Sequence, residues 1–347
     1  MQMPENYSPS AGFETPVLLL IFNRPDTTRR VLEAIRQVRP TRLYVAADGP
    51  RPHRPADEAL CAETRALVHE LVDWPCAVQT LFRASNLNCG VAPATAIDWF
   101  FQHEEEGIIL EDDCVPARSF FPFCAELLAR YRHDTRVMHI GGNNFAAEAA
   151  EVPRPGTESY HFSNQVNSWG WATWRRAWQH FDFRMQRLPE LEAQGKLKGI
   201  YSSWLEERYR LSKIRSVLSL PQPPDVWDYQ WHFAIAANSG LCIVPAVNLV
   251  GNIGFGAQGT HTMDAADSQA DVPTLELPFP LHHPHHVLID RPRDRRRFQE
   301  FLQSRIRAKL SRLFPRRAAA SHAAPTPAPA SVLAPPDAEL LSPAPQA

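Results

Sequence analysis

The feature that most constrains the fold of this chain is an alternation of apolar runs and helix-forming segments before residue 113. The first run, Pro16–Pro25 (PVLLLIFNRP), shows no polar alternation, which is typical of a central parallel strand covered on both faces. Apolar residues at helical spacing follow over 26–38, and Asp26 or Thr27 is the expected N-cap of that helix.

Three further apolar runs follow, separated by segments with helical patterns. The runs are Arg42–Arg51, Cys76–Ala84 and Gly107–Asp113, and the helices between them are expected at about Ala56–Val72 and at Gly90–His103. This order predicts an α/β fold with a doubly wound, mostly parallel sheet and right-handed crossovers.

Polar side chains follow three of the predicted strands, at the edge where ligands bind in such sheets. They are Asn23, Arg24, Asp48, Glu111, Asp112 and Asp113. Adjacent carboxylates after a buried strand suit Mn²⁺ or Mg²⁺, which keep positions open for substrate phosphates. A solvated acidic loop, a surface arginine and a turn cap are the alternatives for the carboxylates, Arg24 and Asp48. Glu104–Glu106 are expected at the solvated end of the preceding helix.

Composition and charge exclude several classes of function. The 347 residues have a formal net charge of −2, so no overall positive field favours a nucleic-acid partner. No apolar run reaches the roughly 18–20 residues that a transmembrane helix needs. The N-terminus lacks the order of a secretory signal and the six cysteines show no CxxC pair, so we expect reduced thiols in a cytoplasmic protein.

Five segments together resemble a known family. They are Leu19–Ile35, Leu43–Arg51, Asn86–Ala92, Glu111–Tyr131 and Ser168–Trp178. As a set they resemble a GT-A nucleotide-sugar glycosyltransferase of the bacterial haemolytic-protein-like group, which is distantly similar to the N-acetylglucosaminyltransferase I family. The resemblance spans roughly residues 15–262 and implies a Rossmann-like GT-A sheet.

The resemblance implies a set of donor-binding residues at and near the strand ends. These are Asn23, Arg24, Asp48, Asn86, Glu111, Asp112, Trp169, Gly170 and Trp171. Among them, Asp48 would read the uracil edge, and the first two carboxylates of the triplet would contact ribose or the donor sugar. Packing is an equal alternative for Trp169 and Trp171, whereas core packing is expected for Trp174 and Trp178.

The resemblance also implies a metal site and a catalytic base. Asp113 would bind Mn²⁺ or Mg²⁺, and His261, in a glycine-rich segment, would reach the metal or the diphosphate. Because the triplet is Glu-Asp-Asp and not Asp-X-Asp, the division of labour between Asp112 and Asp113 stays open. The aromatic-acidic segment that carries the base in inverting members makes Asp228 the candidate base and Asp225 the fallback.

The expected organisation of the chain follows from the same resemblance. The parts are a flexible N-terminus (1–14), a nucleotide-sugar-binding α/β half (15–145), an acceptor and catalytic half of the same domain (146–289), a basic amphipathic helix (290–317) and a disordered Ala/Pro-rich tail (318–347). The basic helix either packs on the domain or lies on the inner face of a membrane, and the sequence leaves both open.

The expected function is metal-dependent, inverting transfer of a sugar from a nucleotide sugar, UDP-sugar being implied by resemblance alone, to a glycan or glycolipid acceptor in surface polysaccharide or glycoconjugate synthesis. The alternatives are a nucleotidyltransferase acting on sugar phosphates and a non-catalytic carbohydrate-binding protein. A nucleotidyltransferase would have a glycine-rich, basic loop after its first strand, where this chain has FNRPDTTRR. A binding module would not need both a carboxylate triplet and a separate aromatic-flanked aspartate.

Overall fold

The structure is a computed structural model that describes residues 12–146, 154, 156–221, 223–255 and 272–313. It divides into two compact units, 1–304 and 305–347, and the features below belong to the first unit unless stated otherwise. The strand–helix alternation predicted from the sequence is confirmed. Its elements are β1 Val17–Ile21, α1 Pro25–Val38, β2 Arg42–Ala47, α2 Ala56–Leu71, β3 Ala77–Phe82, α3 Asn88–His103 and β4 Glu106–Glu111.

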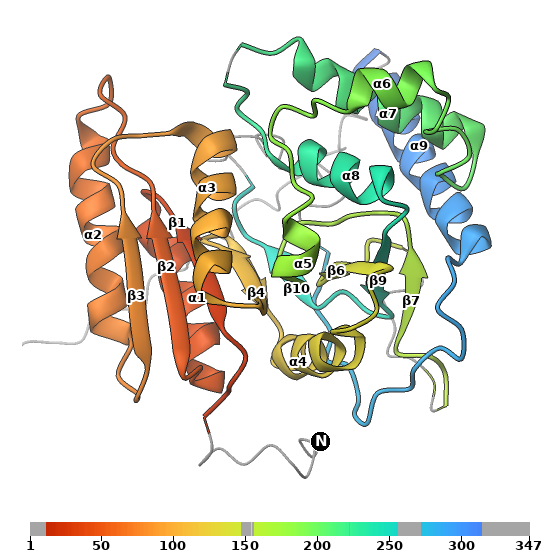
Figure 1. The fold of residues 1–347 in the computed structure, drawn as a ribbon. Coiled ribbons are helices and arrows are strands. Elements are labelled where there is room, and N and C mark those ends of the chain that lie inside the picture. Colours follow the sequence, from red (N-terminus) through yellow and green to blue (C-terminus); the bar gives the residue numbers. More distant parts are fainter. Residues whose placement is uncertain (1–11, 147–153, 155, 222, 256–271, 314–347) are drawn as a thin grey trace, which may run out of the picture. The chain divides into compact units, whose positions relative to one another are not determined.

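These first four strands lie side by side in the order β3-β2-β1-β4, and every pair among them is parallel (Figure 1). In the register of the sheet, Leu20 of β1 lies opposite Glu111 of β4, and Ile21 lies opposite Ala47 of β2. The carboxyl ends of β1, β2 and β4 therefore meet at one edge of the sheet, which is where the sequence predicted a ligand site.

Beyond β4 the sheet becomes mixed. The remaining elements are β5 Cys114–Pro116, α4 Phe120–Tyr131, β6 Val137–Gly141, β7 Tyr160–Ser163, β8 Trp171–Trp174, α5 Arg175–Trp178, α6 Leu188–Ala193, α7 Trp204–Leu218, α8 Asp228–Ala237, β9 Leu241–Pro245, β10 Val250–Asn252 and α9 Arg291–Leu313. The full order is β3-β2-β1-β4-β8-β6-β9-β7, with β8 antiparallel to both β4 and β6, and β10 pairs with β5 separately. The fold is the α/β, mostly parallel, Rossmann-like type that the sequence predicts.

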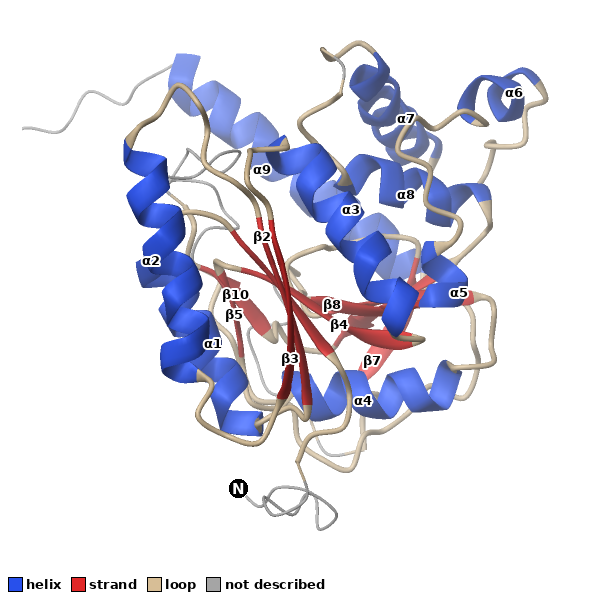
Figure 2. Cartoon of the chain, turned by 60° about the vertical axis from the view of Figure 1, so that its left-hand side comes forward, coloured by secondary structure: helices blue, strands red, loops and turns tan. Residues whose placement is uncertain are grey.

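The absence of polar alternation in β1 has a direct structural cause. Val17, Leu19 and Ile21 pack into a core shared with α1, α2 and α4, while Leu18 and Leu20 pack into a second core shared with α3, α5 and α8. All five side chains are buried, because helices cover both faces of the sheet (Figure 2). A strand in this position has no face that water reaches, so every position is apolar.

Two local predictions were wrong. The first helix begins at Pro25 with Arg24 at the N-cap position, so Asp26 and Thr27 lie inside the helix; proline has the φ angle that a first helical residue needs. Glu104 was expected to be solvated, but it is buried and accepts hydrogen bonds from Tyr44 Oη at 2.8 Å and from Arg42 Nη1 at 2.5 Å. The arginine makes burial of this carboxylate possible, since a buried charge needs a partner.

The basic helix α9 packs on the domain in its first part. Phe298 is buried and lies 5.8 Å from the ring of Tyr209 in α7, and the buried Asp294 accepts a hydrogen bond from Ser163 Oγ at 2.6 Å. These contacts support the packed interpretation for the helix up to residue 304. Among the described helices, none is long and apolar enough to cross a membrane.

Candidate functional site

An arginine holds two of the three carboxylates at the carboxyl edge of the sheet. Arg24, directly after β1, pairs through Nη2 with Asp112 Oδ1 and through Nη1 with Asp113 Oδ2 at 3.0 Å. The backbone N–H of Phe22 donates to the second oxygen of Asp112 at 3.2 Å. Burial lowers the pKa of Arg24, but the pairing with Asp112 and Asp113 outweighs it, so the pKa of the guanidinium is raised. It stays charged.

The three carboxylates carry more negative charge than Arg24 balances. Burial raises the pKa of Glu111 to about 8, and repulsion from Asp113 and Asp112 adds to the effect. Burial also raises the pKa of Asp112 to about 6, although its pairing with Arg24 opposes the shift. A charge imbalance of this kind is relieved by protons or by a cation, and oxygen-only ligands suit Mg²⁺ or Mn²⁺.

The backbone of the chain after β10 closes tightly over Asp113. Ile253 N donates to the carbonyl oxygen of Asp113 at 2.9 Å, and Gly254 N donates to Asn252 Oδ1 at 2.8 Å. A Cβ atom on Gly254 would lie only 2.1 Å from Asp113 Oδ2 and 2.8 Å from Arg24 Nη1. A side chain here would have to displace the Asp113 carboxylate or the Arg24 guanidinium. Gly254 was not predicted as a site residue; the glycine-rich pattern GNIG was the signal that could have identified it.

Asp48 lies at the same edge, and its carboxylate holds the loop that leads into α3. It accepts hydrogen bonds from Leu87 N at 3.0 Å and 3.1 Å, from Gly49 N at 2.9 Å and from Asn86 Nδ2 at 2.9 Å. Burial raises the pKa of Asp48, and these backbone donors oppose that shift. Asp48 and Asn86, which the resemblance placed together, are thus in direct contact.

A network that was not predicted lies beside Asn23. Asn23 Nδ2 donates to Asp57 Oδ1 at 2.8 Å, and Arg51 donates to both oxygens of Asp57 at 2.5 Å and 2.9 Å. The Arg51 hydrogen bond lowers the pKa of Asp57 to about 2. The Arg51 guanidinium also lies 5.1 Å from the ring centre of Phe22. Asp57 ties the β1 and β2 strand-end segments together, and nothing local in the sequence distinguishes it from a surface residue of α2.

The two candidate bases occupy different environments. Asp228 is the first residue of α8, and its charge makes a small contribution to the raised pKa of Glu111, behind burial and the two neighbouring aspartates. The Asp225 carboxylate instead accepts a hydrogen bond from Cys89 N at 2.8 Å, in the first turn of α3. The chain around it is packed closely on that helix, because a Cβ on Gly90 would lie 2.0 Å from Pro224 O.

The tryptophan segment divides between core and site. Trp174 and Trp178 are buried, which confirms their expected packing role. Trp171 is also fully buried, stacked on His139 and Trp227 with ring centres 5.1 Å and 5.7 Å apart, so the structure places it in the core. Packing, the alternative that the sequence left open for Trp171, explains its position.

Trp169 differs from its neighbours because it is only half-buried. Phe145 and Phe255 stand nearly perpendicular to its ring, with ring centres 5.2 Å and 5.5 Å away. Gly170 between the two tryptophans has φ +64°, which favours glycine, and its carbonyl accepts a hydrogen bond from Gly142 N at 2.8 Å. Phe255 directly follows Gly254, the residue that lies against Asp113. Phe145 and Phe255 were not predicted as site residues.

The residues fit a weakly held cation better than a closed metal cage. Over the described ranges, no three His, Cys, Asp or Glu side chains are grouped to hold a metal ion. Mg²⁺ and Mn²⁺ sites of substrate-assisted type use one or two carboxylates together with substrate phosphates, and Asp112 and Asp113 provide that number. His261, the other predicted metal residue, lies outside the described residues.

The chain was also compared with known protein families, sequences and structures. No protein-family model and no curated protein matches the sequence. Among solved structures, the chain is similar to the mannosyltransferase PcManGT from Pyrobaculum calidifontis in complex with GDP-Man and Mn²⁺ (13% identity, 69% of this chain and 77% of that chain, TM-score 0.34). It is also similar to HddC from Yersinia pseudotuberculosis (13% identity, 51% of this chain and 86% of that chain, TM-score 0.31). A third similar structure is the inositol-1-phosphate CTP transferase from T. maritima (8% identity, 75% of this chain and 95% of that chain, TM-score 0.35). At such values the likenesses carry no argument about function, and the α/β fold rests on the strand order itself.

Proposed function

We propose that this chain is a divalent-metal-dependent GT-A glycosyltransferase that moves a sugar, with inversion, from a nucleotide sugar to a hydroxyl group of a glycan or glycolipid. One observation carries the proposal: Arg24 pairs with both Asp112 and Asp113 at the carboxyl edge of the sheet, directly beside Glu111. An anionic edge that needs a cation suits a diphosphate donor, and the aspartate at the start of α8 would supply a general base.

The donor would bind along the ends of β1, β2 and β4. Asp48 and Asn86, joined by a 2.9 Å hydrogen bond, would contact the nucleobase of the donor. Asn23 would support this nucleobase site through its hydrogen bond to Asp57. A UDP-sugar is the expected donor on the resemblance stated above. Glu111, the first carboxyl of the triplet, would contact ribose or the donor sugar, as the resemblance implies.

The metal ligands and Arg24 would together stabilise the negative charge of the diphosphate. Asp113 and Asp112 would hold Mn²⁺ or Mg²⁺, with His261 as a further contact, and the bound ion supplies positive charge to the departing diphosphate. Arg24 already contacts both carboxylates and would orient them, while adding a second positive charge at the same edge.

Asp228 would act as the base of a single displacement. The acceptor oxygen forms a bond to the anomeric carbon while the bond to the diphosphate breaks, and the acceptor proton moves to the Asp228 carboxylate. Asp225, the fallback, makes its hydrogen bond to α3 and would position the segment that precedes Asp228. Trp169, with Phe145 and Phe255, would offer aromatic faces to a sugar ring.

The experiment that tests the proposal compares ligands and a metal-site variant. Thermal stabilisation by UDP with Mn²⁺ should exceed that by CTP, GTP or free sugars, and should be lost in Asp113→Ala together with metal-dependent transfer or hydrolysis of a UDP-sugar. Asp57 and Asp48 stay intact in this variant, so the nucleotide region is unchanged. Stabilisation by CTP together with pyrophosphate release from a sugar phosphate would favour the nucleotidyltransferase instead. Unchanged turnover in Asp113→Ala would contradict the metal assignment.

A further inference from the structure

A surface at the opposite edge of the sheet from the carboxylates combines exposed apolar side chains with arginines. Arg136 precedes β6 and Leu241 begins β9, and these two parallel strands run in the same direction as β4. Their amino ends therefore lie at the edge remote from Asp113. The carboxylates assigned to the metal follow β4 at the other end of this sheet.

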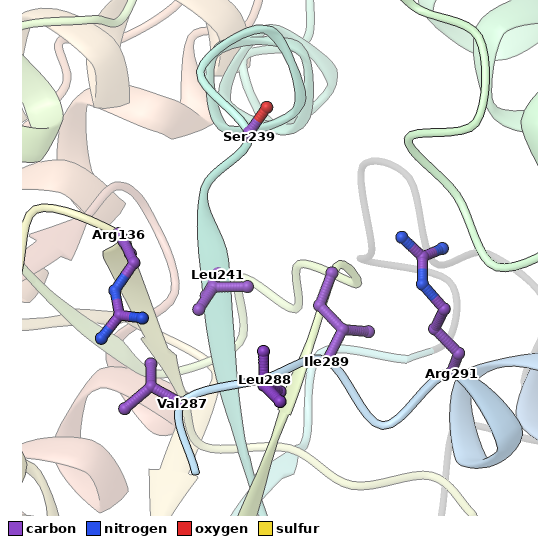
Figure 3. A pocket seen from close by; sticks show the side chains of 7 residues that line it. All are labelled: Arg136, Ser239, Leu241, Val287, Leu288, Ile289 and Arg291. Atoms are coloured by element: carbon purple, nitrogen blue, oxygen red, sulfur yellow. The ribbon is translucent and has the colours of Figure 1, made fainter.

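A shallow pocket lies in this surface. Its volume is about 400 Å³, and its lining is mostly apolar: Leu241, Val287, Leu288, Ile289, Ser239, Arg136 and Arg291. Figure 3 shows the apolar side chains between the two arginines, with Arg136 on one side and Arg291 on the other. Leu288 is 69% exposed and lies between the two arginines of the pocket (Figure 3).

Further exposed apolar side chains lie at the beginning of α7. Trp204 is 73% exposed and Leu205 is 44% exposed. They stand on an ordered helix start, because the Ser203 hydroxyl accepts a hydrogen bond from Glu206 N at 3.2 Å. An indole displayed on a capped helix is held outward by the fold, so its exposure is a feature of the surface.

The beginning of α9 links these two apolar groups. Arg291 Nη1 donates to Tyr201 O at 3.3 Å, and Arg295 Nη2 donates to Ser202 O at 3.1 Å, so both arginines lie along the segment that leads into Trp204. Their acceptors are neutral carbonyl oxygens, which leave the positive charge in place. Arg136 is different, because its guanidinium pairs with Asp134 at 2.7 Å.

We propose that this surface docks on a bilayer containing anionic phospholipids. The docking surface is defined by Trp204, Leu205, Leu288, Arg291 and Arg295. Exposed tryptophan and leucine enter the headgroup and acyl boundary of a membrane, while arginines bind lipid phosphates. Charge complementarity selects the anionic bilayer over a neutral one, since arginines near such a surface each add about fivefold to binding. The proposal concerns contact with the surface only, since no described helix spans a membrane.

Sedimentation of the full-length protein with lipid vesicles tests the proposal. Wild type should bind phosphatidylcholine vesicles that contain phosphatidylglycerol and should not bind pure phosphatidylcholine. The double variant Arg291→Gln with Arg295→Gln should bind these vesicles about 25-fold more weakly, because two positive charges are lost. The double variant Trp204→Ala with Leu288→Ala should also bind about 25-fold more weakly, because two apolar contacts with the membrane are lost. The matched control is Val78→Ala, which alters an exposed apolar residue of β3, 37% exposed, and should bind like wild type.

Other results would overturn the proposal. Equal binding of wild type to both vesicle types would remove the charge argument, and no binding to either would remove the membrane as occupant. If both double variants bind like wild type while Arg305→Gln with Arg307→Gln does not, the later part of α9 is the membrane contact and the docking surface is not. A dimer in analytical ultracentrifugation that Trp204→Ala dissociates, without vesicle binding, would identify a second copy as the occupant. Nucleotide binding, measured in parallel, should be unchanged in every variant whether or not sugar transfer is the reaction.

Discussion

At the scale of single residues, the contact between Gly254 and Asp113 shows how strongly backbone geometry can constrain a site. The missing side chain of Gly254 leaves room for the Asp113 carboxylate and the Arg24 guanidinium at once. A pattern of glycines indicates a close approach somewhere, but the identity of the group approached depends on β10 pairing with β5, where Asn252 lies opposite Cys114.

Replacement of this glycine is the first residue-scale prediction. Gly254→Ala should weaken nucleotide–Mn²⁺ binding by at least about tenfold, because the added methyl group would displace Asp113 or break its pairing with Arg24. The control is Gly251→Ala in β10, three residues earlier, where the nearest atom to a new Cβ is Thr274 Cγ2 at 3.5 Å. Isothermal titration of UDP and Mn²⁺ measures the effect. Similar affinities for the two variants would show that the close approach does not matter for binding.

At the scale of elements, a helix start and the segment before it separate two aspartates that look alike in the sequence. Asp228 begins α8 near the carboxylate triplet, whereas Asp225, three residues earlier, binds the first turn of α3. The sequence ranked Asp228 first by resemblance alone. The structure supplies a physical distinction, since the Asp225 carboxylate accepts a hydrogen bond from Cys89 N in α3, whereas Asp228 is the first residue of α8.

Matched asparagine variants test this distinction. Asp228→Asn should lower the turnover number by about 10²–10⁴-fold while leaving donor affinity unchanged, because a base is lost and binding is not. Asp225→Asn keeps an oxygen that can accept from Cys89 N, so its turnover should stay within about tenfold of wild type. Steady-state kinetics with separate donor-binding measurements give both values. A larger loss in Asp225→Asn than in Asp228→Asn would exchange their roles.

At the scale of the whole molecule, a buried histidine of β6 joins β8, α8 and the segment before β8. His139 of β6 contacts Asn167 O through Nε2 at 3.0 Å, accepts from Trp231 Nε1 at Nδ1 at 3.2 Å, and stacks on Trp171. Protonation at Nδ1 would oppose the indole donor, and burial lowers the pKa of His139 to about 4. The imidazole is therefore neutral in the folded protein.

The pH dependence of stability follows from this lowered pKa. The unfolded chain takes up the proton near pH 6.5, so the unfolded state binds more protons between pH 6.5 and 4, and the free energy of unfolding falls as pH falls through that window. The loss between pH 7.5 and pH 5 should be about 2 kcal/mol from this group. Urea unfolding at the two pH values should show a smaller difference in His139→Gln than in wild type, whatever the variant's absolute stability. An unchanged difference would rule out His139 as the source.

The sequence by itself determined the parallel half of the sheet and the chemical types at its edge. Local periodicity identifies β1 to β4 and their helices, since buried strands and amphipathic helices leave apolar patterns within a few residues. Parallel topology then requires the polar residues after β1, β2 and β4 to share an edge, and they do. Arg24, Asp48 and the Glu111–Asp113 triplet were predicted on that basis.

Only the tertiary structure decided which groups at that edge touch one another. It placed Gly254 on Asp113 and Asp57 beside Asn23, and it buried Trp171 while leaving Trp169 half-exposed. Such contacts join residues far apart in the chain, so no local pattern encodes them. In the mixed half of the sheet, β8 lies antiparallel between β4 and β6. This pairing sets which residues come into contact, because strand order there results from packing and not from order along the chain.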